Sequence, residues 1–181
     1  MRAAKEQLKP DATAVYVAAH QAPAAIEEAI EAEIPLIVAV AEHIPIHDLL
    51  RIHSILSTQS ESRLVGANAP GIISPIGRCR IGFQPLPTFS AGSVGIVAKS
   101  GTLSYETVAS TTRAGVGQSL VIGMGGDVLA GTNFVDGLRV FEHDDDTKGI
   151  IIVGGLEVGQ KKRRQSGSKI TRGELLTQNL S

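Results

Sequence analysis

Cysteine, tryptophan and long apolar runs are scarce in this chain of 181 residues. The single cysteine, Cys79, excludes an internal disulfide and a cysteine-based metal cluster, which fits a protein of a reducing compartment. No apolar run approaches the ~18 residues of a membrane helix, and no secretory hydrophobic segment stands at the N-terminus. We therefore expect a soluble protein with no membrane partner.

An excess of charge of one sign is missing as well. Seventeen basic residues face eighteen acidic ones, for a net charge of −1, and the only basic cluster is Lys161–Arg164. Because the chain offers no broad positive surface for a phosphate backbone, we expect no nucleic-acid partner. The basic cluster itself is interpreted as part of a solvated tail.

Metal-ligand spacing is absent among the five histidines. His43 and His47 are four residues apart, but His43 precedes the predicted helix, so the two do not share a helical face. The acidic run Asp144–Asp146 lies at a predicted helix end and is interpreted as a solvated loop. We predict no metal site.

Short apolar runs alternate with amphipathic stretches, which is typical of βα units on a parallel sheet. We predict strands at residues 13–18, 36–40, 63–65, 93–98, 119–122 and 149–153. We predict helices at residues 22–33, 44–57, 100–114 and 133–143, and part of a helix at 1–9. The predicted fold class is therefore α/β.

A segment rich in proline and glycine, residues 66–87, interrupts this rhythm, so we expect only brief regular structure there and a domain boundary near Pro85. The predicted divisions are a first domain at 1–85, a second at 86–155 and a divergent, disordered tail at 156–181. Because the first helix lacks a preceding strand and the last strand is followed by a polar tail, we expect a chain that is shortened at both ends.

The sharpest local pattern is a strand that runs directly into Ser100-Gly101-Thr102 at a helix start. Backbone N–H groups and the positive end of the helix dipole meet at such a point, which suits a phosphate group. The alternative is an ordinary N-cap, in which Ser100 only satisfies the helix's own N–H groups.

Two further loops follow predicted strands, where ligands gather in open α/β sheets. The loop 123–127, Gly-Met-Gly-Gly-Asp, is either a ligand loop or a flexible connector. The loop 66–71, Gly-Ala-Asn-Ala-Pro-Gly, carries Asn68, which either binds a ligand or bonds its own turn. Glu42, just beyond the strand at 36–40, is either a ligand contact or a solvated charge.

Taken together, five segments resemble the alpha subunits of succinyl-CoA ligase, in the family's order and at its spacing. They are residues 32–38, 41–45, 66–75, 100–106 and 123–127. The resemblance, from about Asp11 to Val153, implies a partial Rossmann-like CoA-binding domain followed by the first part of a flavodoxin-like ligase domain. It also implies nucleotide-dependent interconversion of succinyl-CoA with succinate and coenzyme A in the tricarboxylic acid cycle. A beta subunit would be the partner and would bind the nucleotide and Mg²⁺.

Residue by residue, the resemblance implies CoA contacts at Val40, Ala41, Glu42 and Asn68. Tyr105 matches the family's substrate-binding tyrosine. Ser100, Gly101 and Thr102 match the helix start that faces the phosphorylated histidine. The family's Asn-Cys-Pro-Gly appears here as Asn-Ala-Pro-Gly, and its Ser-Arg-Ser-Gly as Ala-Lys-Ser-Gly.

Two family segments have no counterpart in this sequence: the N-terminal glycine-rich CoA loop and the Gly-His-Ala-Gly of the phosphohistidine. We therefore expect no catalytic residue on the chain and no activity of the chain alone. The alternative is a non-catalytic module that binds CoA or a beta chain, and related acyl-CoA or citrate-cleaving ligases are a third reading. The resemblance implies the mitochondrial matrix in a eukaryote and the cytoplasm otherwise.

Overall fold

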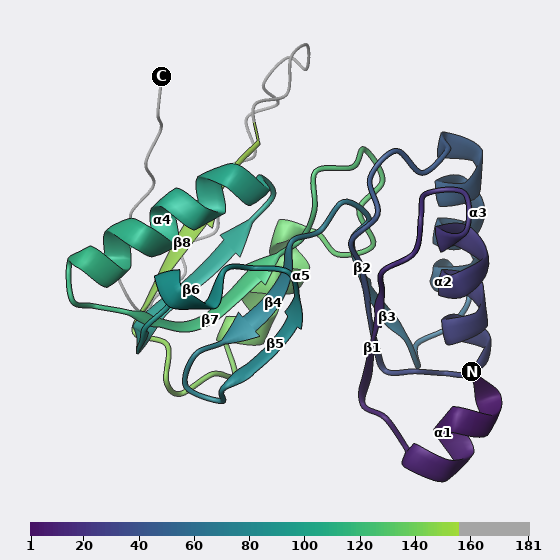
Figure 1. Cartoon of the computed structure of the whole chain (residues 1–181), viewed down its shortest axis with the longest axis horizontal. Coiled ribbons are helices and arrows are strands. Elements are labelled where there is room, and N and C mark those ends of the chain that lie inside the picture. Colours follow the sequence, from purple (N-terminus) through teal and green to yellow (C-terminus); the bar gives the residue numbers. More distant parts are fainter. Residues whose placement is uncertain (156–181) are drawn as a thin grey trace.

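Two β-sheets organise the computed structural model, which describes residues 1–155 (Figure 1). The first sheet contains three parallel strands in the order β1-β2-β3, and the second contains five strands in the order β5-β4-β7-β6-β8. The predicted α/β class is confirmed. The tail predicted at 156–181 and the cluster Lys161–Arg164 lie outside the described residues.

The first sheet consists of β1 (Ala12–Val15), β2 (Leu36–Ala39) and β3 (Arg63–Val65), preceded by the short helix α1 (Arg2–Leu8). Helices α2 (Ala22–Glu31) and α3 (Ile46–Ser57) connect the strands and pack on one face of the sheet (Figure 1). Two successive crossovers of the same hand, moving in one direction across a sheet, place their helices on the same face. The apolar stripe of α2, centred on Ile26, is fully buried there.

The second sheet combines a parallel core with an antiparallel hairpin. The parallel strands are β6 (Ala91–Ala98), β7 (Gln118–Gly123) and β8 (Gly149–Val153). The hairpin strands are β4 (Gly71–Ser74) and β5 (Cys79–Gly82), and β4 pairs antiparallel with β7. A short 3-10 turn at Leu86–Thr88 leads from the hairpin toward β6.

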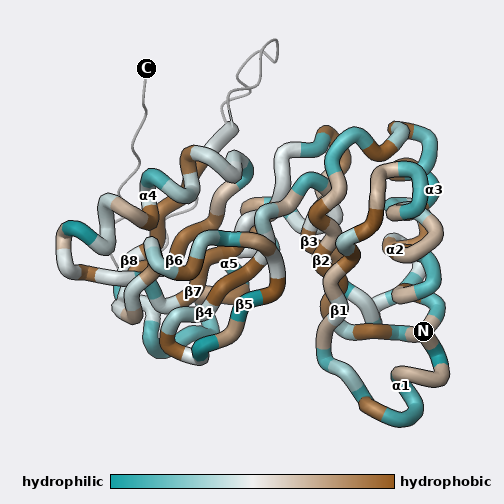
Figure 2. The backbone as a smooth tube through the Cα atoms, viewed as in Figure 1, coloured by the Kyte–Doolittle hydropathy of each residue, from teal (hydrophilic) through white to brown (hydrophobic). Residues whose placement is uncertain are grey.

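One helix covers each face of the second sheet. Helix α4 (Gly101–Arg113) buries Val108 against Ile96 and Val121, and helix α5 (Phe134–Phe141) buries Phe141 against Val97 on the other face. Figure 2 shows hydrophobic segments concentrated on the strands of both sheets. The parallel strands follow the order second, first, third along the chain, which is how a flavodoxin-like sheet begins.

The hairpin lies within residues 66–87, where only brief regular structure was expected, and each of its strands has four residues. That segment contains two strands of the second sheet, β4 and β5. The predicted boundary near Pro85 therefore falls between strands of one and the same sheet. The chain passes from one sheet to the other between Val65 and Gly71. Strand pairing with β7 overrides the local effect of proline and glycine, because Pro70 and Pro75 flank β4 rather than interrupt it.

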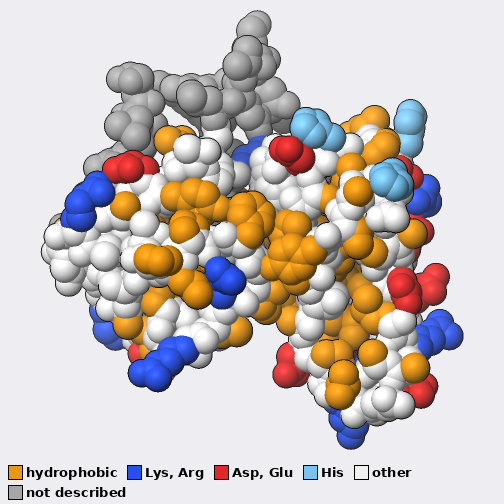
Figure 3. Space-filling view, viewed as in Figure 1, with side chains coloured by type: hydrophobic (Ala, Val, Ile, Leu, Met, Phe, Trp, Pro, Cys, Tyr) orange, Lys and Arg blue, Asp and Glu red, His pale blue; other side chains and the backbone are white. Residues whose placement is uncertain are grey.

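The two sheets meet through the face of the first sheet that α2 and α3 leave open. Val38, Val65 and Ala69 form a buried cluster with Ile72 and Ile81 of the hairpin. Figure 3 shows hydrophobic side chains gathered across this junction on the visible face. Of the described helices, none has both the length and the apolar character needed to span a bilayer.

Candidate functional site

A topological switch point in the second sheet locates the candidate site. From β6 the chain crosses by α4 to β7 on one side, and from β7 it returns by α5 to β8 on the other side. Helices α4 and α5 lie on opposite faces of the sheet, so the loops after β6 and β7 diverge and leave a crevice at the carboxyl ends of the strands. A cleft of about 640 Å³ occupies this position. Its lining residues are Asn68, Pro70, Phe83, Lys99, Ser100, Gly101, Thr102, Leu103, Tyr105, Gly126 and Gly155.

The start of α4 forms one wall of this cleft. Ser100 is the N-cap residue with extended backbone, and its hydroxyl accepts a hydrogen bond from the Leu103 N–H at 3.4 Å. The capping interpretation of Ser100 thus holds, but it satisfies only one of the helix's first N–H groups. The N–H groups of Gly101 and Thr102 have no acceptor within the helix, and both residues line the cleft. They supply donors and the positive end of the dipole to an anion.

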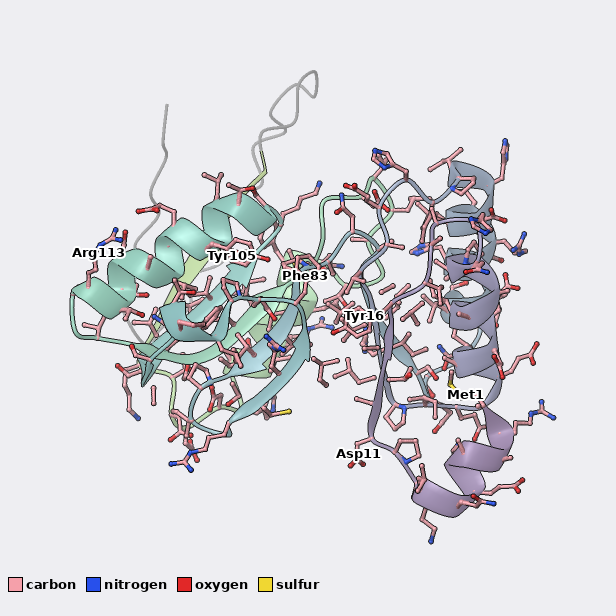
Figure 4. The ribbon with its side chains drawn as sticks, in the orientation of Figure 1. Met1, Asp11, Tyr16, Phe83, Tyr105 and Arg113 are labelled. Carbon is pink, nitrogen blue, oxygen red and sulfur yellow. The ribbon has the colours of Figure 1, made fainter. Side chains whose placement is uncertain are left out.

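Tyr105 lines the same cleft one turn further along α4. Partial burial raises the pKa of the Tyr105 hydroxyl, because desolvation disfavours the phenolate. The hydroxyl therefore stays protonated at neutral pH and can donate a hydrogen bond to a ligand oxygen. Figure 4 shows Tyr105 on α4, beside the second sheet, with Phe83 and Tyr16 on the two sides of the junction between the sheets.

Asn68 enters the cleft from the loop that joins the two sheets. Its backbone is left-handed (φ 56°), its N–H donates to the Ala41 carbonyl at 2.9 Å, and its carbonyl accepts from the Gly126 N–H at 3.3 Å. The loop is thus held between the end of β2 and the glycine-rich loop after β7. A Cβ on Gly125 would lie 2.1 Å from the Ala67 carbonyl oxygen, so glycine is required for this close approach.

Val40, Ala41 and Glu42 follow β2 but do not line the cleft. Ala41 reaches it indirectly, through the hydrogen bond to Asn68. The exposed carboxylate of Glu42 lies 3.8 Å from the imidazole Nδ1 of His43. The structure thus gathers Asn68, Ser100–Thr102 and Tyr105 and leaves these three residues outside.

Asp127 lies near this second group. Burial raises the pKa of the Asp127 carboxyl, Glu42 raises it further, and His43 partly offsets both effects. One carboxyl oxygen of Asp127 is buried, with no hydrogen-bond partner in the part of the chain that the structure describes. Within residues 1–155, no group of three or more histidine, cysteine or acidic side chains is placed to bind a metal.

Phe83, Lys99 and Gly155 line the cleft but were not among the candidate residues from sequence. Lys99 directly precedes the helix start at Ser100, and this position next to a predicted anion site could have indicated it. Phe83 had no signal, because it follows β5, a four-residue strand that was not predicted.

Comparisons with known proteins agree with this architecture. Residues 97–168 match the model of the CoA-ligase family. The chain is 44% identical over 146 residues to succinate–CoA ligase [ADP-forming] subunit alpha 1 of Archaeoglobus fulgidus, covering 81% of this chain and 50% of that one. It is 39% identical over 153 residues to succinate–CoA ligase [ADP-forming] subunit alpha of Staphylococcus aureus, covering 84% of this chain and 50% of that one. The chain thus spans about half the length of these relatives.

Solved structures show the same fold at lower identity. An ATP citrate lyase from Methanothrix soehngenii, solved with citrate and coenzyme A, superposes with a TM-score of 0.71 at 22% identity, over 83% of this chain and 26% of that one. A dinucleotide-forming acetyl-coenzyme A synthetase from Ca. Korarchaeum cryptofilum, solved with phosphate and ADP, gives 0.68 at 21% identity, over 82% and 32%.

Proposed function

Because this chain is a homologue of succinate–CoA ligase alpha subunits, we propose that it carries part of the acyl-CoA and phosphate site of such a ligase. The observation that carries this proposal is the gathering of Asn68, Ser100–Thr102 and Tyr105 in one cleft at the switch point of the second sheet. In the proposal, Val40, Ala41, Glu42 and Asn68 contact coenzyme A. A beta subunit binds the nucleotide and Mg²⁺.

The roles of the cleft residues follow from their chemistry. The N–H groups of Gly101 and Thr102 donate to phosphate oxygens, and the dipole of α4 favours the negative charge. The Tyr105 hydroxyl, kept protonated by burial, donates to a carboxylate oxygen of succinate. Asn68 offers an amide donor and acceptor from the loop that joins the two sheets.

These residues do not supply the nucleophile of the reaction. None of the five histidines stands in a Gly-His-Ala-Gly context. We therefore propose that the 181 residues alone do not become phosphorylated when incubated with labelled ATP or GTP, since a nucleophile must lie within reach before its pKa matters. Acid-labile, alkali-stable label mapped to any of these histidines would contradict this, whereas CoA binding without label would favour a non-catalytic module.

An NMR titration of the chain with inorganic phosphate tests the anion site. Shifts should centre on the amides of Ser100, Gly101 and Thr102, and chloride should compete. A helix terminus stabilises a charge by about 0.3 to 1 kcal/mol when exposed and up to ~2 kcal/mol when partly buried, so we expect a millimolar or weaker Kd.

Proline substitution at the first helical position gives a matched pair of variants. Gly101→Pro removes one donor from the cleft. A Cβ at this position would lie 3.9 Å from Pro70, and among residues 1–155 no other group outside the helix itself and the adjoining residues comes within 4 Å. Ile46→Pro makes the same change in α3, and both positions follow an extended residue that tolerates proline. Phosphate binding should weaken about tenfold in Gly101→Pro and remain unchanged in Ile46→Pro. Equal binding by both variants, or shifts confined to other amides, would refute the anion site.

A further inference from the structure

A second cleft lies between the two sheets, on the α5 side of the second sheet and away from α4. Its volume is about 450 Å³, and it shares no lining residue with the first cleft. It is lined by Leu36, Arg63, Val65, Ile72, Leu120, Ile122, Thr132, Asp136, Gly137, Arg139 and Val140. These residues come from β2, β3, β4, β7, α5 and the loop before α5, so the cleft is formed only when both sheets are in place.

The walls of this junction cleft are aliphatic. Leu36 and Val65 contribute from the first sheet, and Ile72, Leu120 and Ile122 contribute from the second. Thr132 is the most buried polar residue of the lining, with 5% of its surface exposed. Its hydroxyl donates a hydrogen bond to the Leu64 carbonyl at 2.6 Å. With that hydroxyl already bonded, the interior favours a hydrocarbon over a polar ligand.

The three charged residues of the lining leave one positive charge in excess. The Arg63 guanidinium pairs with the Asp136 carboxylate at 3.8 Å. Asp136 also accepts from the Asn133 N–H at 3.0 Å in the capping box of α5, so its charge is committed to protein groups. The exposed side chain of Arg139, on the next turn of α5, supplies the excess charge beside the aliphatic walls.

We propose that the junction cleft binds an aliphatic monocarboxylate of medium chain length. The hydrocarbon chain packs against the aliphatic walls, and the carboxylate pairs with Arg139 at the exposed edge. A volume of about 450 Å³ falls within the usual range of small-molecule sites, which often lie between domains. Because the ligand touches both sheets, its binding also favours their present arrangement. This proposal does not depend on the function of the first cleft.

Titration of the full 181-residue chain with octanoate, followed by NMR and calorimetry, tests the proposal. Shifts should centre on Val65, Ile72, Leu120 and Val140. Hexanoate should bind more weakly, by about fourfold for each methylene removed, which corresponds to ~0.8 kcal/mol. Affinity that does not change with chain length would refute packing in the cleft.

Two valines of α5 provide a matched blocking experiment. Val140 is 47% exposed and lines the cleft, whereas Val135 is 55% exposed and does not. Val140→Trp should weaken octanoate binding more than about tenfold, the equivalent of two methylene contacts, and Val135→Trp should leave it unchanged. Both sites are half exposed, so both variants should fold, as far-UV circular dichroism will verify. Equal affinity in the two variants would overturn the assignment.

The carboxylate contact is tested separately. Arg139→Gln should weaken octanoate binding about two- to fivefold, as expected for an exposed ion pair, and should not change the binding of 1-octanol. Arg113→Gln, on α4, is the control and should affect neither ligand. If Arg139→Gln weakens both ligands equally, or neither, the cleft does not select a carboxylate and the proposed ligand class is wrong.

Discussion

Substitution of Gly137 by alanine tests how tightly α5 is seated on the second sheet. A Cβ at Gly137 would lie 2.8 Å from Cγ1 and 3.2 Å from Cγ2 of Val97. Val97 is fully buried in β6, which lies between β7 and β8, and its branched side chain has little rotamer freedom. Alanine improves helix propensity by about 1 kcal/mol, but overpacking costs typically about 1 to 3 kcal/mol. We expect overpacking to win, with a net loss of about 1 kcal/mol.

In a Val97→Ala background we expect Gly137→Ala to have the opposite effect on stability. The obstructing methyl groups are then gone, so Gly137→Ala should become stabilising by about 1 kcal/mol. The coupling energy in a double-mutant cycle should be about 1 to 3 kcal/mol. Urea denaturation of the four proteins, followed by circular dichroism, measures every corner of the cycle. Stabilisation by Gly137→Ala in the wild-type background, or additivity within about 0.5 kcal/mol, would refute the predicted contact.

Three further predictions concern single side chains. In a Tyr16→Phe background, where Tyr105 is the remaining tyrosine, titration followed by absorbance should give Tyr105 a pKa above the usual ~10. The stability that the protonated Tyr105 hydroxyl contributes is complete below pH ~10 and is lost as pH rises through the pKa of the folded state. Burial raises the pKa of Asp127, so its ionised form opposes folding: Asp127→Asn should be the more stable protein at pH 7 and equal to wild type below pH ~4, by urea denaturation. Asn133→Ala should cost about 1 kcal/mol by the same method, because it removes the 3.0 Å bond from the Asp136 N–H. A Tyr105 pKa below ~10 would contradict the burial of its hydroxyl, and an Asp127→Asn effect independent of pH would contradict the burial of that carboxyl. Unchanged stability in Asn133→Ala would contradict the capping hydrogen bond.

Most of the α/β framework was predictable from the sequence, because each buried element carries its own periodicity. The stripe of Ile26, Ala29 and Ile30 predicted the buried face of α2, and those residues are indeed buried. The hairpin was not predictable in this way. Strand β4 has only four residues, and Gly71 and Gly82 both adopt positive φ where their backbones approach closely. Its pairing with β7 joins residues about fifty positions apart, and no local pattern reports such a contact.

The candidate site was predictable in part for a related reason. Ser100–Thr102 and Asn68 were found because loops at the carboxyl ends of parallel strands converge, whereas Tyr105 was found only through the resemblance to succinyl-CoA ligase alpha subunits. Phe83 reaches the same cleft from the end of β5, an antiparallel strand that was not predicted. The roles assigned to Val40, Ala41 and Glu42 remain predictions, since these residues lie at the end of β2 outside the cleft.

The position of the hairpin in the chain bears on how this protein should be dissected for study. A fragment that starts at the proline-rich segment near Pro85 would keep β6, β7 and β8 but would strip β4 from the edge of β7. The unpaired N–H and carbonyl groups of β7 would then invite association between copies. The complementary fragment would carry Ile72 and Ile81 without the sheet that they extend. A cut before Gly71 instead keeps the strands of each sheet together, so β7 retains its pairing with β4 and its edge stays covered.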